Sequence, residues 1–465
     1  MMFGKRKTDL TEGPLFSKIL MFTLPLIASS ILQSLFGTVD TLMVGRWGGA
    51  TPEECELALA AVGSSGVVIN LLIKLFMGIS LGSGICIAQE IGKKQSDSIS
   101  GVVHTSVVIA MISGVATALV GLVLTRPILA NIMQVDPLLL DVSAAYLRAV
   151  LLGVPASMVY NYCAAMLRSS GDSARPLMFL TVSGGVNVVL NFFMIVIFRL
   201  GALGAGLATT LSNYLACGMI LWYMRRSDGY CHLDFKKLSI DGAILKRITV
   251  IGLPAGVQSV LFNASAAVTQ SAINTFSLAV VAGNAACATV ENYLYIFENA
   301  FYHTVLTFVG QNYGAKKTDR VRRSILYCAL LTVLVGTLVG GVSVWFAKPL
   351  IGLFVPAGSA ALAAGVHRLQ WLGFAYILCG LMEIGSGVMR GFGKATTPMV
   401  VSLLGACVLR ILWINTLFRA FPTPEIVYLS YPICWAVTAL AHGVCCTVTF
   451  RRHAESRTIG VGEEI

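Results

Sequence analysis

The stretch IAQEIGKK at residues 87–94 returns in altered form as VGQNYGAK at residues 309–316, 222 residues further along the chain. A second element, MLRSSG at residues 166–171, corresponds to VMRGFG at residues 388–393 with the same offset. Because two separate elements keep one spacing, the 465-residue chain contains two similar halves.

The composition places both halves in a membrane. The chain is 56% hydrophobic and only 12% charged, whereas soluble domains carry about 25% charged residues. This excludes a water-soluble enzyme. Apolar runs of about 20 residues, long enough to cross ~30 Å of hydrocarbon, recur along the chain. We expect twelve spanning helices, near residues 17–45, 57–90, 99–124, 140–166, 176–198, 203–224, 248–276, 280–309, 324–346, 363–389, 398–418 and 426–450.

The basic residues predict the orientation. If the N-terminus is cytoplasmic, most of the 33 Lys and Arg residues fall in cytoplasmic segments, and only a few, Arg368 among them, fall outside. This is the skew expected of a multi-pass protein of the cytoplasmic (inner) membrane with both termini in the cytoplasm. The net charge of +11 is therefore a topology signal, and we expect no nucleic-acid partner.

Six spans in each half give both halves the same orientation. We therefore predict an all-α integral membrane fold of two six-helix lobes, related by a pseudo-two-fold axis along the membrane normal. The N-lobe covers residues 1–226, a polar cytoplasmic linker covers 227–242, and the C-lobe covers 243–465. Parallel repeats around a central cavity are typical of secondary transporters, although a repeat can also be only an architectural relic.

Polar residues at membrane depth are the candidate functional groups of the first half. An ionisable side chain costs about 2.5–3.5 kcal/mol on insertion scales, so Asp40 in the first span is a site hypothesis. Asn187 and Asn191 share one face of the fifth span, and Thr209 of the sixth span lies at a similar depth. These groups suit a hard cation or a titrating proton. Alternatively, the amides only bond neighbouring helices.

Lys74 in the second span also lies in the outer half of the membrane. It is a possible counter-ion for Asp40, in which case it would occupy the place of a bound metal cation. Alternatively, its long stem carries the ammonium group to interfacial water.

The second half has its own charged residues at membrane depth, which we predict to line a substrate cavity or relay. Glu291 and Glu298 lie two turns apart on one face of the eighth span, and Glu298 near mid-membrane is the strongest candidate. Glu383 of the tenth span and Arg410 of the eleventh are candidates too. A structural ion pair between Glu383 and Arg410 is the simpler interpretation of those two.

Pro25 and Pro254, each preceded by Leu, interrupt spans and predict points where helices bend. The twelve cysteines form no pattern suited to zinc, so no metal site is expected. No phosphate-binding or hydrolase motif occurs either. We therefore expect a protein that is not an enzyme and has no cofactor besides a transported ion, H⁺ or Na⁺.

With these motifs in order, the chain resembles the bacterial members of the multidrug and toxic compound extrusion (MATE) family. The resemblance covers nearly the whole chain. No single motif is specific, but their order across twelve spans is. The matching elements are Leu24-Pro25, Val39-Asp40-Thr41, residues 78–84 (GISLGSG), Arg168 to Gly171, Asn187, residues 204–209 (GAGLAT) and residues 310–315 (GQNYGA).

The resemblance implies an efflux antiporter that exports organic, often cationic or amphipathic, compounds in exchange for H⁺ or Na⁺. It also implies a cation site at Asp40, Asn187, Asn191 and Thr209, with Asn191 replacing the Asp of many members. The expected partners are small-molecule substrates and the lipid bilayer, and the expected state is a monomer. The alternatives are a lipid or polysaccharide flippase of the same superfamily and a membrane-embedded enzyme.

Overall fold

The computed structural model describes residues 9–458, without the side chains of residues 66–72, 96, 132 and 452–458. Of the basic residues that entered the orientation argument, Lys5, Arg6 and Lys7 lie outside the described residues. The described chain is helical and contains no β-strand. It forms two compact units: unit 1 holds residues 9–10 and 24–256, and unit 2 holds residues 11–23 and 257–458. The predicted lobe boundaries remain a prediction.

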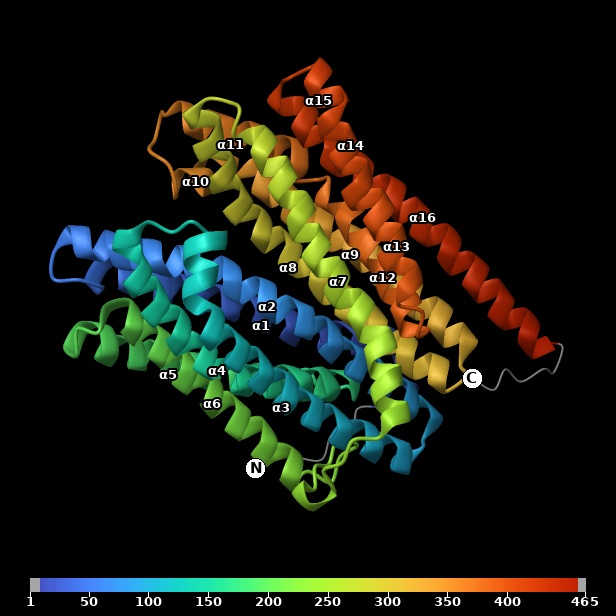
Figure 1. The fold of residues 1–465 in the computed structure, drawn as a ribbon. Helices are drawn as coiled ribbons and strands as arrows, with labels where there is room; N and C mark the ends of the chain where they lie inside the picture. Colours follow the sequence, from blue (N-terminus) through green and yellow to red (C-terminus); the bar gives the residue numbers. More distant parts are fainter. Residues whose placement is uncertain (1–8, 459–465) are drawn as a thin grey trace. The chain divides into compact units, whose positions relative to one another are not determined.

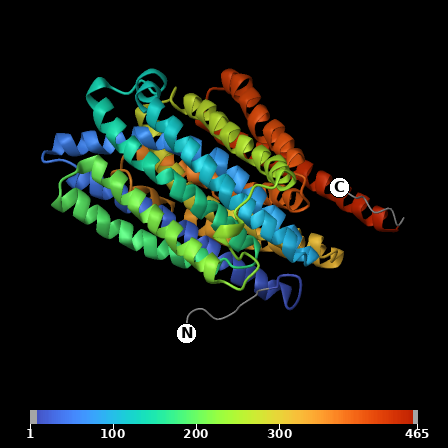
Figure 2. The ribbon, with the colours of Figure 1, turned by 60° about the horizontal axis from the view of Figure 1, so that its bottom comes forward.

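Unit 1 is organised around α4, which packs against α2, α3 and α6 (Figures 1 and 2). Aliphatic residues of α4, among them Leu147, Leu151 and Met158, are buried in this core. The linker after α6 packs on the same unit, because the backbone N–H of Asp234 donates to Nε2 of His104 at 3.1 Å. The elements are α2 (Pro52–Lys93), α3 (Ser96–Pro127), η1 (Ile128–Ile132), α4 (Pro137–Ser169), α5 (Ala174–Asn191), η2 (Phe192–Ile197), α6 (Gly201–Arg226) and η3 (Phe235–Lys237).

Unit 2 is organised around α8, which packs against α9, α11 and α12, while α12 also packs against α16. Its core consists of aliphatic and aromatic clusters between these helices. The elements are α8 (Leu278–Gly314), α9 (Thr318–Trp345), α10 (Ala347–Gly352), α11 (Ala360–Leu372), α12 (Tyr376–Gly391), α13 (Thr396–Ser402), η4 (Leu403–Val408), α14 (Leu409–Asn415), α15 (Leu417–Ala420) and α16 (Pro424–Thr458).

Two helices contribute to both units: α1 (Leu15–Trp47) and α7 (Gly242–Ile273). Each passes from one unit to the other within about one turn of its internal proline, Pro25 or Pro254. The first part of α7 packs closely on α2 because glycines face each other. A Cβ added to Gly78 would lie only 2.1 Å from the backbone nitrogen of Gly256. Only glycine permits this approach.

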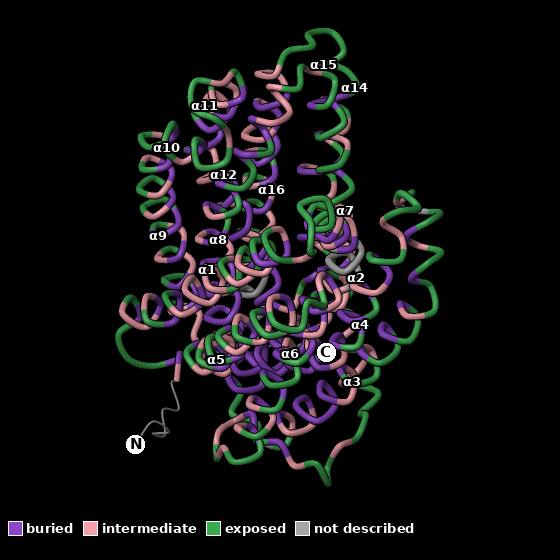
Figure 3. Tube along the Cα trace, turned by 90° about the vertical axis from the view of Figure 1, so that its left-hand side faces the viewer, coloured by how far each residue is buried: buried purple, intermediate pink, exposed green. Residues whose placement is uncertain are grey.

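Nine helices among the described residues are long and apolar enough to span a membrane, or ten if the bent pair α11–α12 is one span. Adding α6 and α8, which are equally long but richer in Gly, Thr and Asn, gives the expected twelve passages. Many large hydrophobic residues of the helices are exposed. Figure 3 marks the exposed residues in green along the Cα trace. On α9 they form a stripe at four-residue intervals: Leu326, Leu330, Leu334 and Leu338. Such a surface suits lipid contact.

Candidate functional site

A polar centre in unit 1 joins α1 to α5. The side-chain amide nitrogen of Asn191 donates one hydrogen bond to the carboxylate of Asp40 and one to Oδ1 of Asn187, the latter at 3.2 Å. Both asparagines are buried, and Asp40 is half-buried. The Oδ1 atom of Asn191 is buried without a hydrogen-bond donor among the described residues. Three of the four predicted coupling residues therefore lie together.

The local sequence explains why these residues meet. Gly184 lies on α5 one turn before Asn187, and Phe36 lies on α1 one turn before Asp40. A Cβ added to Gly184 would lie 1.9 Å from Cε2 of the Phe36 ring, so the glycine allows α1 to pack against α5 at this level. After Asn191 the helix continues as the π-helix η2, a geometry that is frequent at functional sites.

The other two residues proposed for unit 1 are Thr209 and Lys74. The hydroxyl of Thr209 donates to the carbonyl of Ala205 on its own helix at 2.9 Å. Lys74 lies on α2 and is exposed. The counter-ion role of Lys74 therefore stays a prediction.

The repeat motif at residues 87–94 has a packing role at the end of α2. The guanidinium of Arg247 on α7 donates to Glu90 Oε1 at 2.5 Å and to Gln89 Oε1 at 2.7 Å. Lys93 adds an ion pair to Glu90 at 3.2 Å. These bonds fasten the first turns of α7 to α2, next to the glycine contact described above.

Unit 2 contains a buried ion pair that the sequence did not predict. Arg368 on α11 donates from Nε and Nη2 to the two carboxylate oxygens of Glu291, at 2.7 and 2.8 Å. Its Nη1 donates to Oδ1 of Asn284 at 2.7 Å, and the Tyr376 hydroxyl donates to Glu291 at 3.3 Å. The assignment of Arg368 to an outer loop is therefore wrong: the side chain is buried inside the unit. A buried acid at membrane depth, such as Glu291, requires a partner. This requirement is the signal in the sequence that could have led to the ion pair.

The remaining charged candidates of unit 2 are buried but do not form the expected pair. No ion pair within 4.0 Å connects Glu383 with Arg410. Glu383 shares its face of α12 with Arg390, seven residues further on, which itself donates to the Tyr302 hydroxyl and to Gln258. Glu298 packs against glycine backbone and has one buried carboxylate oxygen without a donor.

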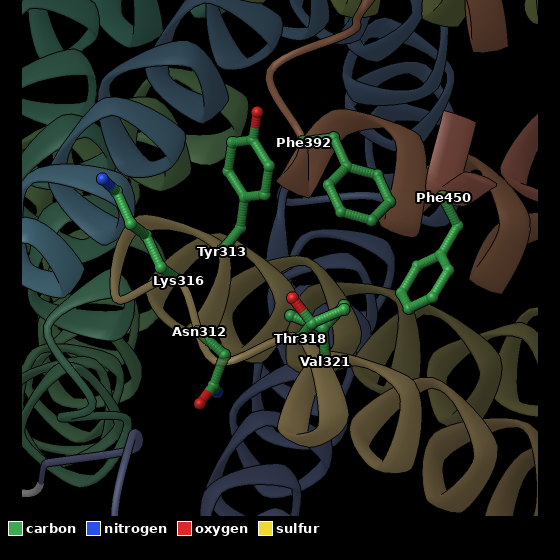
Figure 4. Close-up of a pocket in the computed structure, with 7 residues that line it drawn as sticks. All are labelled: Asn312, Tyr313, Lys316, Thr318, Val321, Phe392 and Phe450. Carbon is green, nitrogen blue, oxygen red and sulfur yellow. The ribbon is translucent and has the colours of Figure 1, made fainter. Parts of the chain in front are cut away.

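Two hollows in unit 2 do not have the character of a substrate site. The first, shown in Figure 4, is lined by Tyr313, Lys316, Phe392 and Phe450 among others, and its volume of about 10 Å³ is close to that of one water molecule. The second, about 870 Å³, is lined mainly by aliphatic side chains of α12 and α16. No group of three or more His, Cys, Asp or Glu side chains suited to a metal ion occurs among the described residues.

Comparison with known proteins agrees with this architecture. The chain matches the MatE family over residues 25–193 and 254–414. A probable multidrug resistance protein of Bacillus subtilis, YoeA, is 28% identical over 90% of this chain and 91% of its own. The probable multidrug resistance protein NorM of Thermotoga maritima is 22% identical over 83% and 82% of the two chains.

A solved structure shares the fold. It is described as the outward-facing conformation of a multidrug resistance MATE family transporter of the MOP superfamily, and it superimposes with a TM-score of 0.89. The identity is 21%, and the match covers 97% of this chain and 99% of the other. The fold is thus the two-lobe, all-α fold of multi-pass membrane transporters. The chain belongs to the MatE family.

Proposed function

We propose that this protein is a secondary active efflux antiporter, which exports organic cationic or amphipathic compounds in exchange for H⁺ or Na⁺. The observation that carries the proposal is the carboxylate of Asp40, held at membrane depth by the amide of Asn191. Placing an ionisable acid at membrane depth costs free energy, so such a residue indicates a functional site. Membership of the MatE family and the names of the multidrug resistance relatives support export of small molecules over a lipid or polysaccharide flippase.

The geometry around Asp40 accommodates either ion. A proton bound to the carboxyl group would provide an O–H donor for the buried Oδ1 of Asn191, which otherwise has none. A sodium ion would be ligated by the same carboxylate together with the amide oxygens of Asn187 and Asn191, since hard cations prefer oxygen ligands. Thr209 would add its hydroxyl oxygen as a further ligand, because donating its proton to the Ala205 carbonyl leaves the lone pairs of that oxygen free.

In the proposed cycle, the ion neutralises Asp40 from the outside and the compound is released there. Inward opening then releases the ion and admits the next compound. The Asp40 carboxylate thus alternates between its charged form and its ion-neutralised form. Pro25 and Pro254 provide the bending points in α1 and α7. The four charged candidates of unit 2 serve a substrate cavity or relay in this proposal: Glu291, Glu298, Glu383 and Arg410.

The proposal includes the cellular setting. The protein works in the cytoplasmic membrane as a monomer with both termini in the cytoplasm, binds no nucleic acid, catalyses no covalent reaction and needs no resident cofactor or metal. The basic residues that precede and follow the spans support the orientation.

Efflux from proteoliposomes tests the function. Purified protein is reconstituted with an entrapped fluorescent cation, and a pH gradient and a Na⁺ gradient are imposed separately. We expect export under at least one gradient and none in protein-free vesicles. Failure of both gradients to drive export of any of a panel of organic cations and amphipathic compounds would refute the proposed function.

A further inference from the structure

A long groove runs along α16 on the surface of unit 2. It lies between α12 and α16, has a volume of about 870 Å³, and is lined on α16 from Ala436 to Arg451. At about 1.5 Å per residue this stretch is about 22 Å long, more than the ~15 Å of one hydrocarbon leaflet. Leu440 and Val444, which also line it, are 72% and 64% exposed. The groove therefore opens to the surroundings of the helices.

Small residues create the groove. Gly385 brings α12 close to α16, because a Cβ added to it would lie 2.5 Å from the Cβ of His442. The next residue of α16, Gly443, lines the groove, and a Cβ added to it would meet no atom of the described residues within 4 Å. Ala436 and Ala439 line it as well. Because these side chains are short, the space beside the helix contact stays open.

The lining is apolar along the groove and basic at one end. Near this end lie Ile325 of α9, Val388 of α12 and Val448 of α16, and Arg451 adds an exposed guanidinium group. Among the described residues that line the groove, none is acidic. The apolar part suits a hydrocarbon chain, and the arginine suits the phosphate of an anionic headgroup.

The width of the groove favours a hydrocarbon chain over a helix from a second copy of the protein. A volume of about 870 Å³ over about 22 Å corresponds to a mean cross-section of about 40 Å². An α-helix with its side chains is about 10–12 Å across, so its cross-section is about 80–110 Å². The small residues Ala439, Gly443 and Thr447 have the spacing of helix-packing motifs, but the space beside them is too narrow for a helix.

We propose that this groove binds an acyl chain of an anionic phospholipid, and that Arg451 binds the phosphate of the same lipid. The inference goes beyond the proposed efflux function and does not depend on it. Under the proposed orientation the C-terminal end of α16 is cytoplasmic, so the lipid belongs to the cytoplasmic leaflet.

Native mass spectrometry of the purified full-length protein tests the headgroup. Palmitoyl-oleoyl phosphatidylglycerol and phosphatidylcholine have the same acyl chains and differ in headgroup charge. Wild type should bind the first phosphatidylglycerol about fivefold more tightly than the first phosphatidylcholine, which is the effect of one basic side chain near an anionic lipid. Arg451→Gln should abolish this preference. Arg226→Gln, which replaces an exposed arginine at the end of α6, should keep it.

A second pair of variants tests the groove. Gly443→Leu fills open space in the groove, so it should remove the first binding step for both lipids. Gly218→Leu is the matched control, because Gly218 on α6 is also exposed, has no described atom within 4 Å of an added Cβ, and does not line the groove. Phosphatidylglycerol should raise the melting temperature of wild type and Gly218→Leu, but not that of Gly443→Leu.

Cross-linking locates the lipid. Phosphatidylglycerol with a photoreactive diazirine in its acyl chain should label residues 378–388 of α12 and 436–448 of α16 in wild type. If Gly443→Leu does not fold, this experiment and Arg451→Gln, whose change lies at an exposed position, decide the question.

Four results would overturn the inference. Two concern the headgroup: equal affinity of wild type for the two lipids, and a preference that persists in Arg451→Gln. Two concern the groove: unchanged lipid binding by Gly443→Leu, and cross-links found only on other helices. A dimer of wild type that Gly443→Leu dissociates would also contradict it, because a second copy of the chain would then occupy the groove.

Discussion

Replacing Glu291 by methionine leaves Arg368 as a buried guanidinium without its carboxylate. The two side chains are each 6% exposed and are joined by two hydrogen bonds, at 2.7 and 2.8 Å. Removing one partner of such a buried pair costs about 3–5 kcal/mol. For a unit of this size that corresponds to a fall in melting temperature of about 6–20 °C.

The effect should be strongly non-additive. Arg368→Met alone should lower the melting temperature as Glu291→Met does, because it leaves the carboxylate uncompensated. The double variant Glu291→Met/Arg368→Met should melt above either single variant, since methionines of similar volume can fill the space without a buried charge. The remaining loss comes from Asn284 and Tyr376, which also lose hydrogen bonds in the double variant.

The cysteines provide the assay. All twelve are free, and all but Cys445 and Cys446 are buried, so a thiol-reactive fluorogenic dye reports unfolding on heating. The exposed pair Arg126 and Asp141 serves as a matched control, since removing a surface ion pair changes stability by at most about 1 kcal/mol. Single variants that melt like wild type, or a double variant that melts at the sum of both losses, would refute the reasoning.

Two other contacts yield predictions for the same melting assay. Gly184→Ala places a Cβ 1.9 Å from the Phe36 ring, so it should lower the free energy of unfolding by about 1–3 kcal/mol. Adding Phe36→Leu should restore part of this stability. If it does not, the ring is not the obstacle. Glu90→Gln should lower the free energy of unfolding by about 1 kcal/mol. The loss is small because Arg247 is 36% exposed and solvent weakens the ion pair. The charge-swapped variant Glu90→Arg/Arg247→Glu should recover part of the lost stability. A loss in Glu90→Gln that stays constant up to high salt would contradict an electrostatic origin.

Much of the architecture was predictable because the bilayer imposes simple rules. Helix length follows from hydrocarbon thickness, and the even number of spans per half follows from the repeat. Asp40, Asn187 and Asn191 could be grouped for a related reason. The two asparagines are four residues apart on one helix, and a polar group at that depth needs a partner.

The pairing of charges in unit 2 was not predictable. Depth along a helix does not fix rotation about its axis, so Glu383 and Arg410 seemed to be partners although no ion pair joins them. Arg368 and Glu291 are 77 residues apart in sequence, and the basic-residue count placed Arg368 in a loop.

Coupling through Asp40 is tested most directly by gradient-driven efflux of Asp40→Asn. The control is Asp97→Asn, an exposed aspartate in the first turn of α3. Both variants are reconstituted at equal protein density, and export is measured under a pH gradient and a Na⁺ gradient. The account predicts that Asp40→Asn falls to the level of protein-free vesicles under both gradients, while Asp97→Asn keeps the wild-type rate. Wild-type export by Asp40→Asn under either gradient would contradict it.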